Sequence, residues 1–250
     1  MFIRRGLTIT LMFLWNKITS CAYTIFLQVL ASGPIPKHIA FILDGNRRYA
    51  RKNNMPVPQG HSEGSESLHR MLEICLRLNV KCISAYVFSL AEKKLIEITQ
   101  GEFLEKHGVR LNVVGNKELL PAAVQKAARE AEGRTRHNTR FILNLHMPYT
   151  SRDEITSAVA SCVRNSMQDE SKIPIITEKD IDAQLMTSLG GSPPLDILIR
   201  PSGVKRLSDY MLWQCCEDTQ IQFCPTYWPE FGLFDFVPII LDYQRRNQNK

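Results

Sequence analysis

The chain contains 250 residues, of which 44% are hydrophobic and 22% are charged, and its formal net charge is +6. This length allows one sizeable hydrophobic core, and this composition excludes disordered and fibrous proteins. The seven cysteines are odd in number and include no C-x-x-C pair, which argues against a zinc site and favours reduced thiols on the cytosolic side of a membrane.

Most of the excess positive charge lies at the start of the chain. Residues 1–52 contain eight basic side chains and one acidic side chain, Asp44, a local balance of 8 − 1 = +7. These basic residues adjoin an apolar segment and are not interleaved with aromatic residues along one face. The pattern therefore favours a membrane surface or anionic phosphates as partners, and not nucleic acid.

The apolar segment at residues 7–31 is interrupted by Asn16, Lys17 and Gln28. Its uninterrupted stretches are shorter than the roughly 20 residues that span a bilayer. A basic start before an apolar run is compatible with a signal peptide, but the cysteine pattern argues against export. We therefore predict that residues 1–33 form a membrane-associating segment, an amphipathic helix lying in the membrane plane. A helix that packs on the domain or on a partner is the alternative.

A break of Gly and Pro at residues 33–36 separates this segment from one domain, residues 34–250. Within it, short apolar runs recur that are continuous and not alternating, as strands buried on both faces of a parallel sheet are. We predict six strands: His38–Leu43, Cys82–Phe88, Val109–Val114, Phe141–Leu145, Leu195–Ile199 and Ile221–Cys224.

Helical patterns lie between these strands. One follows Ser62, with apolar residues at spacings of three and four: Leu68, Met71, Leu72, Cys75 and Leu76. A second runs from Pro121 to a stop near Gly133, and a third follows Thr150 and Ser151 with acidic residues in its first turn. The predicted fold class is α/β, a single domain with a mostly parallel sheet of about six strands flanked by helices.

Binding sites in such sheets lie beyond the carboxyl ends of the strands. The first strand ends in Asp44, Gly45, Asn46, Arg47 and Arg48. The glycine allows backbone amides to approach an anion, the guanidinium groups suit a diphosphate, and one carboxylate beside substrate phosphates suits Mg²⁺. A turn with solvated arginines is an equally good interpretation at this point.

The fifth strand is followed by a second group of basic and hydroxyl side chains, including Arg200, Arg206 and Ser208. No G-x-x-x-x-G-K-[ST] loop is present here. Two anion-binding strand ends in one small domain favour two diphosphate substrates. Ser89 offers one hydroxyl after the second strand. His61 is a candidate phosphate donor or proton relay, although a capping or core histidine is the usual role of a lone histidine.

Several segments resemble the cis-prenyltransferases, the undecaprenyl and dehydrodolichyl diphosphate synthases, and above all fungal-like eukaryotic subunits. They are HIAFILDGNRRYARK at 38–52, GHSEG at 60–64, NLHMPYTSRDEI at 144–155, ILIRPSGVKRLSDYMLWQ at 197–214 and YWPEFG at 227–232. The resemblance implies a parallel-sheet fold with a hydrophobic tunnel. It also implies a transferase that condenses isopentenyl diphosphate onto an allylic diphosphate, farnesyl diphosphate, in cis.

The resemblance also implies roles for single residues. Asp44 would be the catalytic residue, binding Mg²⁺ and the leaving diphosphate. Gly45, Asn46, Arg47, Arg48, His61 and Ser89 would form the allylic diphosphate site. Arg200, Arg206 and Ser208 would hold isopentenyl diphosphate. The product would be a long-chain polyprenyl diphosphate for dolichol and protein glycosylation, made on the cytosolic face of the endoplasmic reticulum membrane.

The sequence departs from the family after Ser89, where an E-N-x-x-R-S motif is expected and roughly 15 residues, about four helical turns, are missing. The helix that remains, Leu95–Leu104, should still be amphipathic. Smaller departures are Val57 in place of a basic residue, Pro201 in place of Thr and Val204 in place of Glu.

These departures leave alternatives open. The chain is an active prenyltransferase, a catalytically impaired isoform or non-catalytic subunit of a heteromeric enzyme, or a membrane-surface scaffold. The C-terminal sequence RRNQNK lacks the R-x-G ending of accessory subunits. This difference implies a dimer in which an accessory cis-prenyltransferase subunit supplies that ending.

Overall fold

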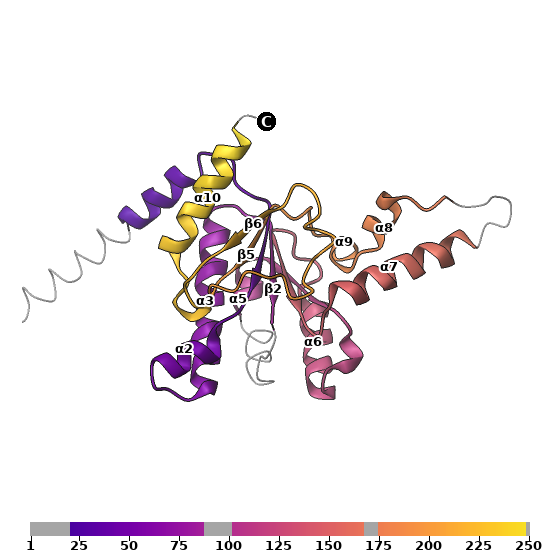
Figure 1. The fold of residues 1–250 in the computed structure, drawn as a ribbon, viewed down its shortest axis with the longest axis horizontal. Helices are drawn as coiled ribbons and strands as arrows, with labels where there is room; N and C mark the ends of the chain where they lie inside the picture. The colour runs from indigo at the N-terminus through magenta and orange to yellow at the C-terminus, as the bar shows by residue number, and fades with distance from the viewer. Residues whose placement is uncertain (1–20, 88–101, 168–174, 249–250) are drawn as a thin grey trace, which may run out of the picture.

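In the computed structural model, the described residues are 21–87, 102–167 and 175–248. They form one six-stranded sheet in the order β3-β4-β2-β1-β5-β6, and every neighbouring pair of strands is parallel (Figure 1). The strands are β1 His38–Ile42, β2 Cys82–Tyr86, β3 Val109–Val114, β4 Phe141–His146, β5 Ile197–Arg200 and β6 Gln220–Phe223. All six predicted strands are confirmed, with ends that differ by at most two residues.

Alternate residues of β1 face two different apolar clusters. Ile39 and Phe41 belong to the larger cluster, which includes residues of α3, α6 and α10, whereas Ala40 and Ile42 belong to the smaller one with Tyr210. All five residues of β1 are buried. Burial on both faces explains why the strand sequences are continuously apolar.

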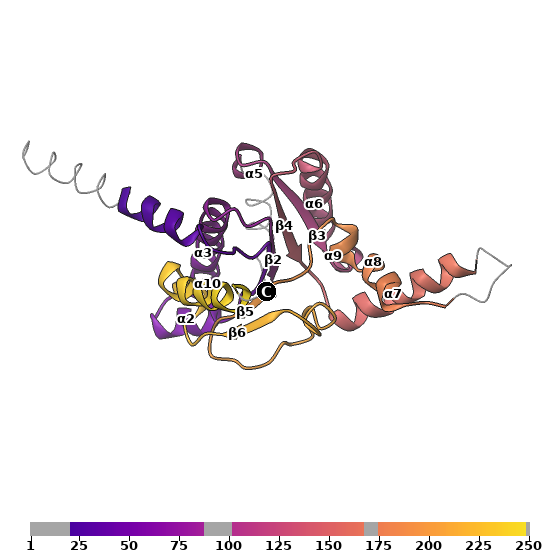
Figure 2. The same cartoon turned by 90° about the horizontal axis from the view of Figure 1, so that it is seen from above.

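Helices cover both faces of the sheet, with α3 and α10 on one side and α7, α8 and α9 on the other (Figure 2). The α-helices that follow the first strand are α2 Asn46–Lys52, α3 Val57–Arg77, α5 Phe103–Lys106, α6 Ala122–Thr135, α7 Ser151–Ser166, α8 Glu178–Gln184, α9 Met186–Leu189 and α10 Leu233–Asn247. Short 3₁₀ helices span Lys117–Leu119 and Trp228–Glu230.

The three predicted helices are confirmed as α3, α6 and α7. The side chain of Thr150 accepts a hydrogen bond from the backbone N–H of Asp153 and caps α7, as its sequence predicts. Helix α6 continues two residues past the predicted stop at Gly133. Packing of Ala131 and Thr135, both buried, outweighs the helix cost of one glycine, about 1 kcal/mol. Most of the predicted helix Leu95–Leu104 lies outside the described residues.

Within the described part of the N-terminal segment, residues 21–33, residues 21–30 are helical. Leu27 and Leu30 are buried in the larger apolar cluster, and the side chain of Gln244 on α10 donates a hydrogen bond of 2.7 Å to the carbonyl of Leu30. Phe26 and Val29 are exposed. Among the described residues, no helix is long and apolar enough to cross a membrane. The membrane-associating role of residues 1–33 stays a prediction.

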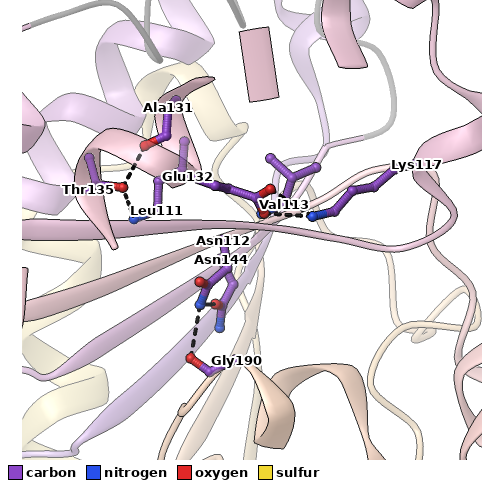
Figure 3. A network of polar contacts seen from close by, with 9 residues as sticks. All are labelled: Leu111, Asn112, Val113, Lys117, Ala131, Glu132, Thr135, Asn144 and Gly190. Carbon is purple, nitrogen blue, oxygen red and sulfur yellow. Dashed lines mark hydrogen bonds and ion pairs between the residues drawn. The ribbon is translucent and has the colours of Figure 1, made fainter. Parts of the chain in front are cut away.

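Side chains of α6 cover the edge of the sheet at β3 (Figure 3). The backbone N–H of Val113 donates to Glu132 at 2.8 Å, and that of Leu111 donates to the hydroxyl of Thr135 at 3.1 Å. Glu132 also pairs with Lys117 at 2.7 Å. Because β3 has a strand neighbour on one side alone, these N–H groups would otherwise lack partners and leave an open edge.

Replacing Glu132 with Ala should therefore destabilise the fold. Val113 is buried, so its N–H would lose a hydrogen bond that water cannot fully replace, and the free energy of unfolding should fall by about 2 kcal/mol. The matched control is Glu130→Ala on the same helix, which removes an exposed pair with Lys126 at 3.9 Å and should cost less than about 0.5 kcal/mol. Urea unfolding measures both, and equal losses would contradict the proposed edge contact.

Candidate active site

The candidate site lies where β1 and β5 run side by side. The chain leaves β1 to form β2, β3 and β4 on one side, and returns to form β5 and β6 on the other. The carboxyl ends of β1 and β5 therefore lie at the point where the strand order reverses, where α/β sheets place their ligands. This topology brings together the two groups of arginines, which are more than 150 residues apart in the sequence.

Asp44 follows β1 and pairs with one guanidinium on each oxygen. Its Oδ2 is 2.9 Å from Nη2 of Arg200, and its Oδ1 is 3.2 Å from Nη2 of Arg48. Burial by itself would raise the pKa of Asp44, but the hydrogen bond from Arg200 and the charges of both arginines outweigh it and lower the pKa below its ordinary value. Asp44 is therefore an ionised carboxylate at neutral pH.

A tight turn joins Asp44 to helix α2. Gly45 has φ of +106°, and a Cβ there would lie 2.9 Å from the ring of Tyr227, so both its conformation and its surroundings require glycine. Asn46 begins the helix, and its Oδ1 is buried with no hydrogen-bond partner among the described residues. Helix α3 approaches closely at Gly60, where a Cβ would lie 2.6 Å from the carbonyl oxygen of Asn46. The five residues Asp44–Arg48 thus form the connection after β1 and the first turn of α2.

The two arginines of this turn have different surroundings. Arg48 donates from Nη1 to the carbonyl of Ser202 at 3.1 Å and lies over the ring of Tyr227 at 5.3 Å. The side chain of Arg47 is exposed. Burial, followed by the positive charge of Arg47, lowers the pKa of His61 on α3 below its ordinary value. His61 is thus close enough to Arg47 to sense its charge and is mostly neutral at neutral pH.

Arg200 at the end of β5 is the most buried charged group of the site, with 3% of its side chain exposed. Besides Asp44, it donates to the hydroxyl of Ser208 at 2.8 Å and to the carbonyl of Arg206. Its Nε is buried without a described partner. The loop holds Ser202 at φ +87° and Ser208 at φ +55°, conformations that cost energy in residues other than glycine. The side chain of Arg206 is exposed.

The structure thus places most of the predicted site residues at the carboxyl ends of two neighbouring strands, β1 and β5. Asp44, Gly45, Asn46 and Arg48 lie beside Arg200 and Ser208 through the contacts above. Their roles in binding stay predictions. Ser89 lies outside the described residues, as do its neighbours 88–101, and the described residues do not show the predicted hydrophobic tunnel.

Two contributors were not predicted as site residues. Ser202 provides the carbonyl that holds Arg48, and Tyr227 provides the ring beneath it. Both stand within the segments that carry the family resemblance, 197–214 and 227–232, but neither carries a charge that would mark it in the sequence. Their places follow from the strand order, which brings the loops after β5 and β6 to the end of β1.

The structure is thus a parallel α/β domain with a carboxylate held between two arginines at the reversal of strand order. This is the place where α/β sheets bind their ligands, and arginine side chains suit phosphate groups. Comparisons with known proteins give the family. The family model described as "Putative undecaprenyl diphosphate synthase" matches residues 42–250. The chain therefore belongs to this prenyltransferase family, the cis-prenyltransferases, and the predicted resemblance is confirmed.

Single relatives agree with this assignment. The chain is 40% identical to a dehydrodolichyl diphosphate synthase complex subunit of Schizosaccharomyces pombe, over 90% of this chain and 91% of the relative. It is 36% identical to a geranylgeranyl-diphosphate-specific tritrans,polycis-undecaprenyl-diphosphate synthase of Thermococcus kodakarensis, over 94% of both chains. Lavandulyl diphosphate synthase from Lavandula x intermedia, solved in complex with dimethylallyl diphosphate, superposes with a TM-score of 0.77 at 25% identity, covering 84% of this chain and 95% of the other.

Proposed function

We propose that the chain condenses isopentenyl diphosphate onto an allylic diphosphate, such as farnesyl diphosphate, to extend a polyprenyl chain in cis for dolichol synthesis. The observation that carries this proposal is the meeting of two arginine-containing strand ends at Asp44, within the family fold. Relatives whose names describe synthases align with the chain over about nine-tenths of both lengths, which does not favour a non-catalytic subunit.

In this proposal the two strand ends bind different substrates. The turn of residues 44–48 receives the allylic diphosphate, whose C–O bond breaks as the diphosphate leaves with the electron pair. Arg48 stabilises the charge that develops on the departing oxygen. Arg200, Arg206 and Ser208 hold the diphosphate of isopentenyl diphosphate, whose double bond forms the new C–C bond to the allylic carbon. The tertiary cation that results loses a proton from C2 to the released diphosphate, which forms the new double bond and leaves diphosphate as the second product.

The residues of the turn fit Mg²⁺ as the cofactor. Mg²⁺ prefers one or two protein carboxylates together with substrate phosphates and water, and Asp44 offers one ionised carboxylate. The described residues include no group of three or more His, Cys, Asp or Glu side chains that would hold a metal without substrate. Asp44 would therefore hold Mg²⁺ jointly with the allylic diphosphate, where the ion would neutralise charge on the leaving group.

The names of two relatives support a partner subunit for this chain. Two of them, from Schizosaccharomyces pombe and Saccharomyces cerevisiae, are described as subunits of a dehydrodolichyl diphosphate synthase complex. We propose that this chain likewise works in a dimer with an accessory subunit, at the cytosolic face of the endoplasmic reticulum membrane. The exposed apolar side chains Ile25, Phe26 and Val29 on the helix of residues 21–30 support contact with that membrane.

The test is chain elongation in solution. The full chain, with and without an accessory subunit, is incubated with Mg²⁺, farnesyl diphosphate and labelled isopentenyl diphosphate, and the lengths of the extracted products are measured. We expect long-chain polyprenyl diphosphate, with more product in the presence of the accessory subunit. Folded protein that gives no extension under either condition would contradict the proposal.

A further inference from the structure

The segment that follows β6 packs against the turn that follows β1. The backbone N–H of Trp228 donates to the carbonyl of Asp44 at 3.1 Å, and Lys52 pairs with Glu230 at 3.1 Å. Tyr227 directly precedes Trp228, and its ring leaves no room for a side chain at Gly45. Residues near the C-terminus thus brace the predicted allylic diphosphate turn.

Arg48 is held by three neighbours, the carboxylate of Asp44, the backbone carbonyl of Ser202 and the ring of Tyr227. The guanidinium carbon lies 5.3 Å from the centre of the Tyr227 ring, within the range of a cation–π contact. Its two terminal nitrogens contact Asp44 at 3.2 Å and the carbonyl of Ser202 at 3.1 Å. The side chain of Arg48 is 40% exposed, so without such contacts it would sample many rotamers.

The contact with Asp44 is the one that a bound metal and diphosphate would change, because the carboxylate then has other partners. The contacts with Tyr227 and with the carbonyl of Ser202 do not depend on ligand charge. A planar ring under the guanidinium fixes its plane and leaves its edge for hydrogen bonds to phosphate oxygens. Lys52 also lies 5.8 Å from the same ring, but Glu230 accepts its hydrogen bonds.

We propose that Tyr227 is a positioning residue, which holds the guanidinium of Arg48 at the allylic diphosphate site through the face of its ring. This inference rests on the proposed function. The ring, and not the hydroxyl, makes the contact with Arg48. The substrate class that Tyr227 would affect is the allylic diphosphate, and isopentenyl diphosphate should be unaffected.

The experiment measures the affinity of the full chain for farnesyl thiolodiphosphate, an unreactive analogue, by calorimetry with Mg²⁺. We expect Tyr227→Leu to bind it about tenfold more weakly than the wild type, and Tyr227→Phe to stay within about threefold. In an Arg48→Ala background, Tyr227→Leu should have no further effect, because its action passes through Arg48. The affinity for isopentenyl diphosphate is measured in parallel and should not change.

The chain offers a matched control in Tyr23, whose ring lies 5.7 Å from the guanidinium of Arg77 on α3. Neither Tyr23 nor Arg77 is among the predicted site residues. Tyr23→Leu removes the same kind of contact and should leave both affinities unchanged. Wild-type affinity of Tyr227→Leu would overturn the proposal, as would an equal loss in the Arg48→Ala background. A wild type that binds the analogue but never elongates would contradict the proposed function alone, while the comparison of variants still decides the role of Tyr227.

Discussion

Replacing Asp44 with Ala is expected to lower the rate of chain elongation by roughly 10³-fold or more. Asp44 lies between Arg48 and Arg200, and each of its oxygens pairs with one guanidinium. In the proposed reaction it holds Mg²⁺ at the leaving diphosphate, and Ala offers no oxygen for that purpose. The measurement is kcat with farnesyl diphosphate and labelled isopentenyl diphosphate, at saturating Mg²⁺.

A second variant, Asp44→Asn, separates charge from shape. The amide keeps the size of the side chain and one acceptor oxygen, but it cannot supply an anionic ligand to Mg²⁺. We expect Asn to be nearly as inactive as Ala and to require more Mg²⁺ for any residual turnover. Both variants leave the buried Arg200 without its carboxylate, so thermal unfolding must show that the protein is still folded. Substantial activity in the folded Ala variant would contradict the role of Asp44.

The pH dependence gives an independent check. The pKa of Asp44 lies below the ordinary value of 3.8, so its contribution to stability is present above that value and is lost as pH falls through the lowered pKa. Elongation should therefore not lose activity between pH 7 and pH 5 through protonation of Asp44. If activity does fall in that range, a group other than Asp44 is titrating. The pH at which activity falls to half should then be the same in the residual activity of Asp44→Asn as in the wild type.

Much of the fold could be predicted because the strands are short, continuous apolar runs. Strand β1, His38–Ile42, is an example: it is buried on both faces, so its sequence lacks the alternation of apolar and polar residues that a half-exposed strand shows. The general position of the site could also be predicted from the sequence, because ligands bind at the carboxyl ends of parallel strands. Clusters of arginine at two of those ends were visible without any structure.

The arrangement inside the site could not be predicted from local sequence. The ion pair of Asp44 with Arg200 joins residues 156 positions apart, and it exists because β5 lies beside β1. Local patterns do not state strand order. The sequence does not mark Tyr227 for the same reason, since its contact with Arg48 depends on the ring lying next to Gly45 and Arg48 in the fold. The turn after Asp44, for which a solvated loop was an equal alternative, leads directly into helix α2.

Replacing Arg200 with Met should weaken both substrate binding and the fold. Its side chain is 3% exposed, and its guanidinium contacts Asp44, Ser208 and the carbonyl of Arg206, so it closes the loop after β5 onto the end of β1. Met has a similar length but no charge or donor. We expect the KM for isopentenyl diphosphate to rise by roughly 10²-fold, as expected when a buried charged donor to a diphosphate is lost.

The same variant should lower the free energy of unfolding by about 2 kcal/mol. Loss of one partner of a buried pair costs about 3–5 kcal/mol, but Asp44 is 27% exposed and keeps Arg48, which reduces the penalty. Arg200→Lys should recover part of the stability and little of the binding, because an ammonium group cannot reach two partners in a fork.

Two other arginines make the comparison informative. Arg206→Ala removes an exposed side chain and should raise the KM for isopentenyl diphosphate with little change in stability. Arg164→Ala, on the exposed face of α7, removes a guanidinium that donates to Ser161 at 2.9 Å and should change neither quantity. If Arg200→Met lost stability but kept the wild-type KM, Arg200 would be a structural brace of the loop, and the isopentenyl diphosphate site would lie elsewhere.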